Sequence, residues 1–162
     1  MKKHGQGRNR SSDLQYVDTA DFFVDRKLNW WDRSGPMEKL HQLNNLRLPY
    51  IKEETSRWLG APCDSPLRAL SVLDVGCGWG SMCFEIAKQS ECEVTGVTLS
   101  KNQYEYCKKK AKELKLDNQC YFELLDYRQL KGKFHRVVSV GMLEHVGRKF
   151  YKTFFRKIND LM

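Results

Sequence analysis

Residues 71–81 read SVLDVGCGWGS, and this stretch decides the fold of the chain. An apolar run carries Asp74 near its end and is followed by glycine at the alternate positions 76, 78 and 80. A strand that runs into a glycine turn lets the backbone approach a ligand at the carboxyl end of a parallel sheet. We therefore expect a ligand-binding loop at Asp74, Gly76, Gly78 and Gly80.

Strand-like and helical patterns alternate after this stretch. Apolar, β-rich runs occupy residues 70–75, 92–98, 120–125 and 136–141, and helical patterns occupy residues 81–89, 101–116 and 148–161. This alternation predicts βαβ units and hence an α/β fold with a parallel sheet. In the last helix the spacing of Phe150, Phe154 and Ile158 predicts an apolar stripe that packs on the core.

The N-terminal third has a different character. Residues 1–12 are basic, polar and without periodicity, which predicts a disordered leader. Residues 13–60 predict a helical cover, with Pro49 in the first turn of a helix and Gly60 just past its end. Residues 61–162 then form the α/β domain.

Composition narrows the class of partner. The 162 residues carry a net charge of +8, and residues 101–162 hold 15 basic and 7 acidic side chains. Such an excess suits an anionic phospholipid surface or a nucleic acid, although it can also serve only solubility. No apolar run approaches the ~20 residues that cross a bilayer, so we expect any membrane contact to be peripheral.

The six cysteines form no C-x-x-C pair and no metal-like cluster with the histidines. We therefore expect reduced thiols, a cytoplasmic location and no metal site.

The glycine pattern excludes two common nucleotide sites. A dinucleotide fingerprint fails because Ser81 replaces its last glycine and Thr98 replaces the expected acid, and no Walker G-K-[S/T] follows. The arrangement D-x-G-x-G-x-G resembles the first motif of the Rossmann-like class I methyltransferases, which use S-adenosylmethionine. That resemblance implies that the glycines let the backbone run close to the bound cofactor and that Asp74 positions their loop.

Three later stretches, VTGVTLSKNQ (94–103), residues 124–147 and FYKTFFRKINDL (150–161), resemble the cyclopropane-fatty-acyl-phospholipid synthases and their mycolic-acid relatives. This resemblance implies transfer of the methyl carbon of S-adenosylmethionine to the double bond of an unsaturated phospholipid acyl chain. The cofactor contacts it implies are Thr98, Leu99, Gln103, Asp126, Tyr127 and Gly141.

The same resemblance makes Glu144 the catalytic residue, through a bicarbonate ion that it holds beside the reacting centre. When a cis alkene attacks the sulfonium methyl group, a carbocation forms, and a base must then remove a proton so that the ring closes. A structural role for Glu144, as a helix cap or in an ion pair, stays open. We interpret His145 as a structural neighbour.

Residues 29–51 resemble a second family, the O-methyltransferases of ubiquinone biosynthesis, in which Arg47 would contact the cofactor. O-methylation of a polyprenyl-quinone intermediate is therefore an alternative, although Thr98 stands where those enzymes place an acid. A non-catalytic cofactor-binding fragment is a third possibility. Nucleic-acid methylation is disfavoured, because GMLEHV follows the fourth strand in place of an N-P-P-Y-like motif.

A complete fold of this class has seven strands, and the chain supplies four. We expect the sheet to stop after the fourth strand and to leave it as an apolar edge, with marginal stability as a result. The oligomeric state stays open. We expect a location peripheral to the inner membrane surface.

Overall fold

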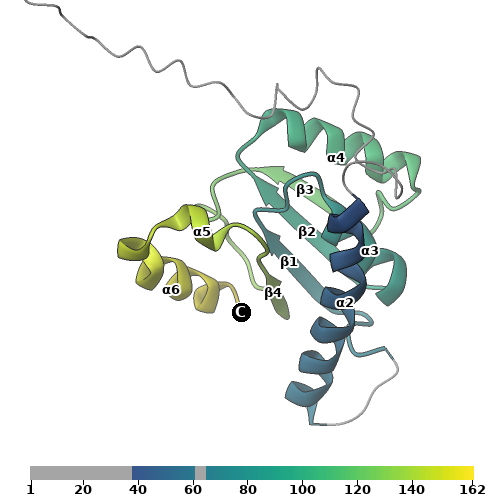
Figure 1. Ribbon diagram of the computed structural model, residues 1–162, viewed down its shortest axis with the longest axis horizontal. Coiled ribbons are helices and arrows are strands. Elements are labelled where there is room, and N and C mark those ends of the chain that lie inside the picture. The colour runs from purple at the N-terminus through teal and green to yellow at the C-terminus, as the bar shows by residue number, and fades with distance from the viewer. Residues whose placement is uncertain (1–37, 61–64) are drawn as a thin grey trace, which may run out of the picture.

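A computed structural model describes residues 38–60 and 65–162 and shows a parallel sheet flanked by helices (Figure 1). The strands are β1 (Ser71–Val75), β2 (Glu93–Thr98), β3 (Cys120–Leu124) and β4 (Arg136–Val138). Their order across the sheet is β3-β2-β1-β4, and all three pairings are parallel. The predicted α/β fold is confirmed.

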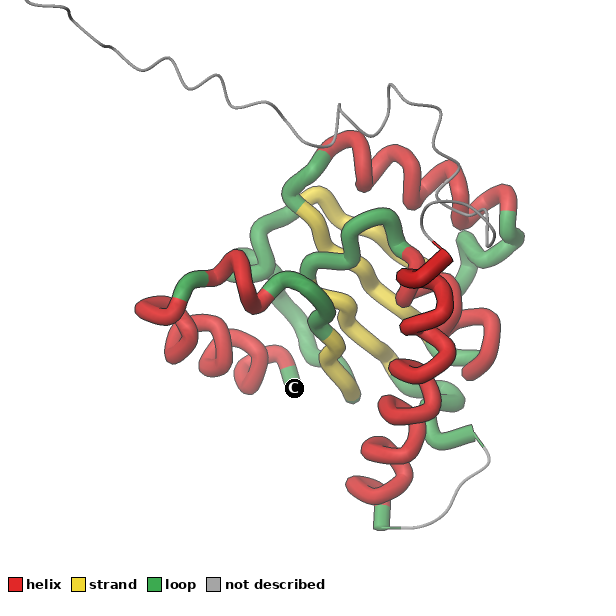
Figure 2. Tube along the Cα trace, viewed as in Figure 1, coloured by secondary structure: helices red, strands yellow, loops and turns green. Residues whose placement is uncertain are grey.

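Helices cover both faces of this sheet (Figure 2). The helices are α2 (Glu38–Leu59), α3 (Ser81–Ser90), α4 (Lys101–Glu113), α5 (Leu143–Val146), the 3-10 turn η1 (Arg148–Phe150) and α6 (Tyr151–Leu161). Helices α2, α3 and α4 pack against one face, and α6 with α5 packs against the other. The short helix α5 has no counterpart among the predicted elements.

Two hydrophobic clusters result from the alternation of side chains along each strand. Val72 and Val94 point into the cluster under α3 and α4, whereas Leu73 and Val75 point into the cluster under α6. All four side chains are completely buried. Because β1 contributes to both clusters, it forms the centre of the molecule.

The boundaries of the N-terminal cover differ from the prediction. The leader at residues 1–12 and residues 13–37 of the cover lie outside the described residues, so neither prediction is tested. Pro49 lies in the middle of α2 and not in its first turn, so that prediction was wrong. The helix continues through it because Leu48 and Thr55 bury themselves against the domain on either side. Gly60 follows the helix end with φ 73°, as predicted.

Phe150 also differs from its prediction. Phe154 is buried and Ile158 is half-buried under the sheet, but Phe150 belongs to η1 and is 51% exposed. The 3-10 turn changes the helical spacing between Phe150 and Phe154. The Phe150 side chain therefore does not belong to the apolar stripe in the core and lies near the carboxyl ends of the strands.

Candidate cofactor-binding site

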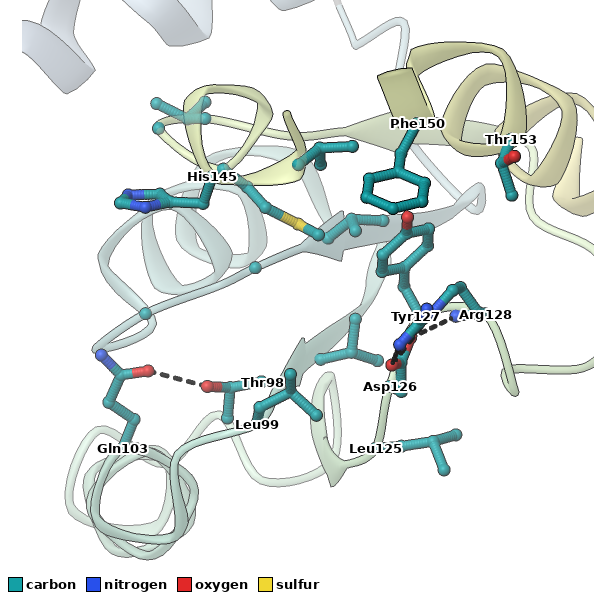
Figure 3. Close-up of a pocket in the computed structure, with 18 residues that line it drawn as sticks. Thr98, Leu99, Gln103, Leu125, Asp126, Tyr127, Arg128, His145, Phe150 and Thr153 are labelled. Carbon is teal, nitrogen blue, oxygen red and sulfur yellow. Dashed lines mark hydrogen bonds and ion pairs between the residues drawn. The ribbon is translucent and has the colours of Figure 1, made fainter. Parts of the chain in front are cut away.

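A cavity of about 640 Å³ lies at the carboxyl ends of all four strands (Figure 3). Ligands of open α/β sheets bind at this edge, because loops from successive strands converge there. Its walls are Val75, Gly76, Gly78, Val97, Thr98, Leu99, Gln103, Leu125, Asp126, Tyr127, Arg128, Val140, Gly141, Met142, His145, Val146, Phe150 and Thr153. The sequence motifs thus converge on one place in the fold.

The three glycines of the turn after β1 have positive φ angles, but their surroundings differ. A Cβ atom on Gly76 would lie 2.9 Å from the side chain of Met142, and one on Gly80 would lie 2.8 Å from the Phe84 ring. A Cβ atom on Gly78 would meet nothing within 4 Å. Gly76 and Gly80 therefore permit close packing, and only Gly78 faces open space in the cavity wall.

Thr98, at the end of β2, positions the start of α4. Its hydroxyl donates a hydrogen bond to Gln103 Oε1 at 2.7 Å and accepts one from the backbone N–H of Ser100 at 3.2 Å. The Ser100 side chain in turn caps α4 by accepting from the N–H of Gln103. Gln103 is held at the cavity wall in this way, and Leu99 beside it is 74% exposed.

Asp126 and Tyr127 form the wall after β3. The guanidinium Nε of Arg128 donates to both carboxylate oxygens of Asp126 at 3.0 Å. This hydrogen bond holds the pKa of Asp126 below its usual range. The carboxylate is therefore ionised at neutral pH and its orientation is fixed.

The segment after β4 closes the cavity from the opposite side. Gly141 has φ 74°, and a Cβ atom there would meet nothing within 4 Å. Met142 and His145 also line the wall, whereas Glu144 is exposed on α5 and lies outside the lining residues. The structure thus brings His145, which we interpreted as a structural neighbour, to the cavity, and does not bring Glu144 there.

Asp74 lies beneath the glycine turn and not on the cavity wall. It is only 2% exposed, and its Oδ2 accepts a hydrogen bond from the thiol of Cys83 at 3.3 Å. Burial raises the pKa of this carboxyl to about 7, since the charged form loses its hydration. Asp74 can therefore act on the turn only from below, and Gly80 is likewise absent from the lining residues.

Arg47 lies at a second cavity of about 430 Å³, between α2 and β4. It donates to Asn44 Oδ1 at 3.2 Å, and Asn44 is itself bonded to the Ser81 hydroxyl. Arg47 is absent from the residues that line the first cavity. Its predicted contact with the cofactor stays a prediction.

Several wall residues escaped the sequence analysis: Leu125, Arg128, Val140, Met142, His145, Val146, Phe150 and Thr153. Most of them follow β4, where a loop, a short helix and a 3-10 turn occur in twelve residues (139–150) and no single periodicity persists. In the sequence, only the closeness of Met142 and His145 to Glu144, a candidate catalytic residue, could have indicated that they lie at the site. Their placement depends on how α6 docks under the sheet.

The sequence pattern of the family described as mycolic acid cyclopropane synthetase matches residues 68–162, more than half of the chain. The chain belongs to this family. The family match begins just before β1 and spans every strand and every wall residue of the cavity.

Two curated relatives match this family member over different lengths. Cyclopropane-fatty-acyl-phospholipid synthase of Escherichia coli K12 is 40% identical over 90 residues, which cover 56% of the chain and 22% of the synthase. The ubiquinone biosynthesis O-methyltransferase of Pelagibacter ubique is 31% identical over 118 residues, which cover 72% of the chain and 49% of that enzyme. The chain thus spans about a fifth of the synthase and half of the O-methyltransferase.

A solved structure supports the same fold. Mycolic acid cyclopropane synthase CmaA1, complexed with SAH and CTAB, superimposes with a TM-score of 0.57 and 29% identity. The match covers 68% of this chain and 38% of CmaA1. The sheet of this mycolic acid cyclopropane synthetase family member is therefore the Rossmann-like sheet of the class I methyltransferases, as predicted.

Proposed function

We propose that the cavity binds S-adenosylmethionine and that the chain supplies the cofactor-binding part of a methyltransferase of the cyclopropane synthase type. One observation carries this proposal. The glycine turn of the family motif opens into a cavity that the carboxyl ends of all four strands line. In CmaA1, a member of the same type, the bound molecule SAH is the demethylated form of the cofactor.

The wall fits such a cofactor in two respects. Gly78 and Gly141 leave their backbone uncovered, with open space where a side chain would stand. The apolar side chains Leu99, Leu125 and Val146 supply surfaces on which a flat base can pack. We propose that Thr98, Leu99 and Gln103 hold the ribose and adenosine side, and that Asp126 and Tyr127 lie near the adenine.

The proposed reaction is transfer of the methyl carbon to the double bond of an unsaturated phospholipid acyl chain. S-adenosylmethionine supplies the electrophilic methyl group. The protein must then exclude water, which would trap the cationic centre that forms on the acyl chain. Val140, Met142 and Phe150 contribute apolar wall at the β4 side and suit that task.

We retain Glu144 as the proposed catalytic carboxylate, with bicarbonate as its proposed partner. The resemblance of its surrounding motif supports this role, and its position next to the wall residue His145 keeps it one residue from the cavity. Transfer activity that survives Glu144→Gln would remove the role. We propose that the reaction takes place on the cytoplasmic side, at the inner membrane surface.

Calorimetric titration with S-adenosylhomocysteine tests the cofactor site. Gly78→Val places a branched side chain in the open wall, so we expect binding to be lost. Gly132→Val is the matched control, because Gly132 also has a positive φ and open surroundings but lies in an exposed loop outside the lining residues. Equal loss in both variants, or undiminished binding in Gly78→Val, would contradict the proposal.

A transfer assay tests the substrate. Labelled S-adenosylmethionine is incubated with vesicles of unsaturated phospholipid or with a catechol precursor of a polyprenyl quinone. Label in the lipid supports the leading proposal. Label in the catechol supports the O-methyltransferase alternative, which the match to the Pelagibacter enzyme motivates. Cofactor binding without label in either substrate identifies a non-catalytic binding fragment.

A further inference from the structure

The outward face of η1 and α6 combines cations with aromatic rings. Residues 148–157 contain five basic and no acidic side chains. The basic aromatic surface, as we define it, consists of the exposed residues Arg148, Lys149, Phe150, Lys152, Phe155 and Arg156. Phe150 is 51% exposed and Phe155 is 55% exposed, so two large apolar rings stand in solvent among four positive charges.

The fold does not require this surface. Helix α6 packs on the sheet through Phe154 and Leu161, and Lys152 and Arg156 lie on the opposite side of the helix. Lys157 is different, because its ammonium group donates to the backbone carbonyl of Leu130 at 2.7 Å. Among the described residues, the four cations of the surface make no ion pair with any acidic side chain. Their charge is therefore available to a partner.

The surface also adjoins the cavity. Phe150 belongs to the surface and to the cavity wall, and Thr153 lines the wall from the first turn of α6. In Figure 3 the ring of Phe150 points toward Tyr127 across the cavity, and Thr153 lies beside it. A partner that rests on this surface therefore lies at the mouth of the cavity.

We propose that the basic aromatic surface docks the chain on an anionic phospholipid bilayer. Lys and Arg side chains near a membrane attract acidic headgroups, and exposed aromatic rings insert at the level of the headgroups. A nucleic acid would match the charges, but it offers no apolar phase to Phe155. None of the described helices is long and apolar enough to span a bilayer.

This docking does not depend on the proposed methyl transfer, since it requires neither cofactor nor turnover. It places the mouth of the cavity against the lipid, with the apolar wall facing the acyl region. Because the apolar side of α6 is already buried under the sheet, the helix lies on the membrane surface and only its exposed rings enter.

Vesicle co-sedimentation of the full chain tests the proposal. The probes are vesicles of phosphatidylcholine alone and of phosphatidylcholine mixed with phosphatidylglycerol, without cofactor. We expect binding only to the mixed vesicles, and we expect it to weaken as salt rises. The double variant Lys152→Glu/Arg156→Glu should lower the affinity about tenfold or more.

Helix α4 offers a matched control. Lys108 and Lys112 are exposed and four residues apart, as Lys152 and Arg156 are, but α4 covers the other face of the sheet (Figure 1). Lys108→Glu/Lys112→Glu changes the net charge equally and should change vesicle affinity by less than about twofold. Equal losses in both double variants would overturn the proposal, because net charge alone would then explain binding.

Phe155→Ser tests the aromatic component. The ring contacts Phe154 at a centroid distance of 5.3 Å and Tyr151 at 6.5 Å but is otherwise exposed, so thermal unfolding is measured beside binding. We expect Phe155→Ser to bind vesicles more weakly than the wild type does. This difference should remain at high salt, because the contribution of the ring is not electrostatic. Unchanged vesicle binding, or preferential binding of a DNA duplex that Lys152→Glu/Arg156→Glu abolishes, would overturn the proposal.

Titration of Lys152→Glu/Arg156→Glu with S-adenosylhomocysteine separates this result from the cofactor proposal. Neither residue lines the cavity, so we expect cofactor affinity to stay unchanged while vesicle binding falls. Loss of both together, in a variant whose thermal unfolding is unchanged, would show that the surface belongs to the cofactor site and would overturn the docking role.

Discussion

Gly78 and Gly80 lie two residues apart in one turn, but a side chain would be excluded at the two positions for different reasons. Open space surrounds the position of a Cβ atom on Gly78, whereas Phe84 and Cys107 crowd the same position on Gly80. The first glycine leaves room for a ligand, and the second lets α3 start against the core. Substitutions at the two positions therefore have different consequences, one for binding and one for stability.

Gly80→Ala should lower the free energy of unfolding by about 2 to 4 kcal/mol, from the strained positive φ and the overpacked contact with Phe84 together. Gly132→Ala has a positive φ without the contact, and should cost about 1 kcal/mol. Urea unfolding of both variants measures the two costs. Similar values for the two would contradict the role of packing at Gly80.

Asp74 should make stability depend on pH. Its pKa is about 7 in the folded chain, through burial first and the nearby Cys77 second, and about 3.9 in an unfolded chain. Below pH ~4 the carboxyl is neutral in both states, and its burial carries no charge penalty. Between about pH 4 and about pH 7 the unfolded chain loses this proton while the folded chain keeps it, so stability falls across this window and levels off above pH 7, where both states are ionised.

The measurement compares the wild type with Asp74→Asn, which cannot ionise. Relative to Asp74→Asn, the wild type should lose about 3 kcal/mol in free energy of unfolding between about pH 4 and about pH 7. Titrating groups that do not interact with Asp74 cancel in this difference. A difference that stays constant with pH would contradict the ionisation of Asp74.

The sequence predicted which segments surround the cavity better than it predicted which of their residues line its wall. Of the run from Asp74 to Gly80, which we predicted to be a ligand loop, Gly76 and Gly78 line the cavity. However, Asp74 is buried and Gly80 packs against Phe84, so neither of them lines the cavity. The pattern D-x-G-x-G-x-G does not record this difference, which is set by how Met142 and Phe84 pack around it.

At the scale of elements, the strands and the helices α3 and α4 agree with their predictions because each has one sustained period. Strand β4 ends at Val138, three residues before the predicted end. The Ser139 hydroxyl donates to the carbonyl of Val75 at 2.9 Å and engages an acceptor at the end of β1. Such a side-chain bond is invisible to a pattern of apolar residues.

Helix α2 contains a proline, Pro49, that destabilises it and can be replaced. Pro49 is exposed in the helix interior, and it has no N–H to donate to the preceding turn. Pro49→Ala should therefore raise the free energy of unfolding by about 1 to 3 kcal/mol. The greater conformational entropy of the unfolded chain without proline offsets part of this gain. Asn45→Ala, exposed one turn earlier, should change stability by less than about 0.7 kcal/mol. Thermal unfolding of both checks this, and a destabilised Pro49→Ala would contradict it.

At the scale of the whole molecule, the sheet is asymmetric. Strand β3 borders the sheet on one side, and β4 borders it on the other with β1 as its one partner among the described strands. Trp58 and Tyr50 stand exposed on α2 at the cavity beside β4, and Arg136 of β4 stacks on the Trp58 ring at 4.3 Å. Apolar surface thus adjoins a strand edge, which favours pairing with another chain.

We expect this edge to make the chain associate. The unfolding midpoint should then rise with protein concentration, since association stabilises the folded state by mass action. Thermal unfolding at two concentrations about tenfold apart, with sedimentation velocity beside it, measures this. One sharp, reversible, concentration-independent transition of a monomer would contradict the prediction.

The central position of β1 also has a consequence for the order of assembly during synthesis. It pairs with β2 across about 22 residues of sequence, since Ser71 lies beside Glu93, but its pairing with β4 joins residues 64 apart, such as Val72 and Arg136. Contacts across a longer loop form more slowly, because closing the loop costs more chain entropy before the contacts stabilise the structure. Strands β1, β2 and β3 can therefore form a sheet while β4 is still being translated, so the floor of the cavity exists before its last wall arrives.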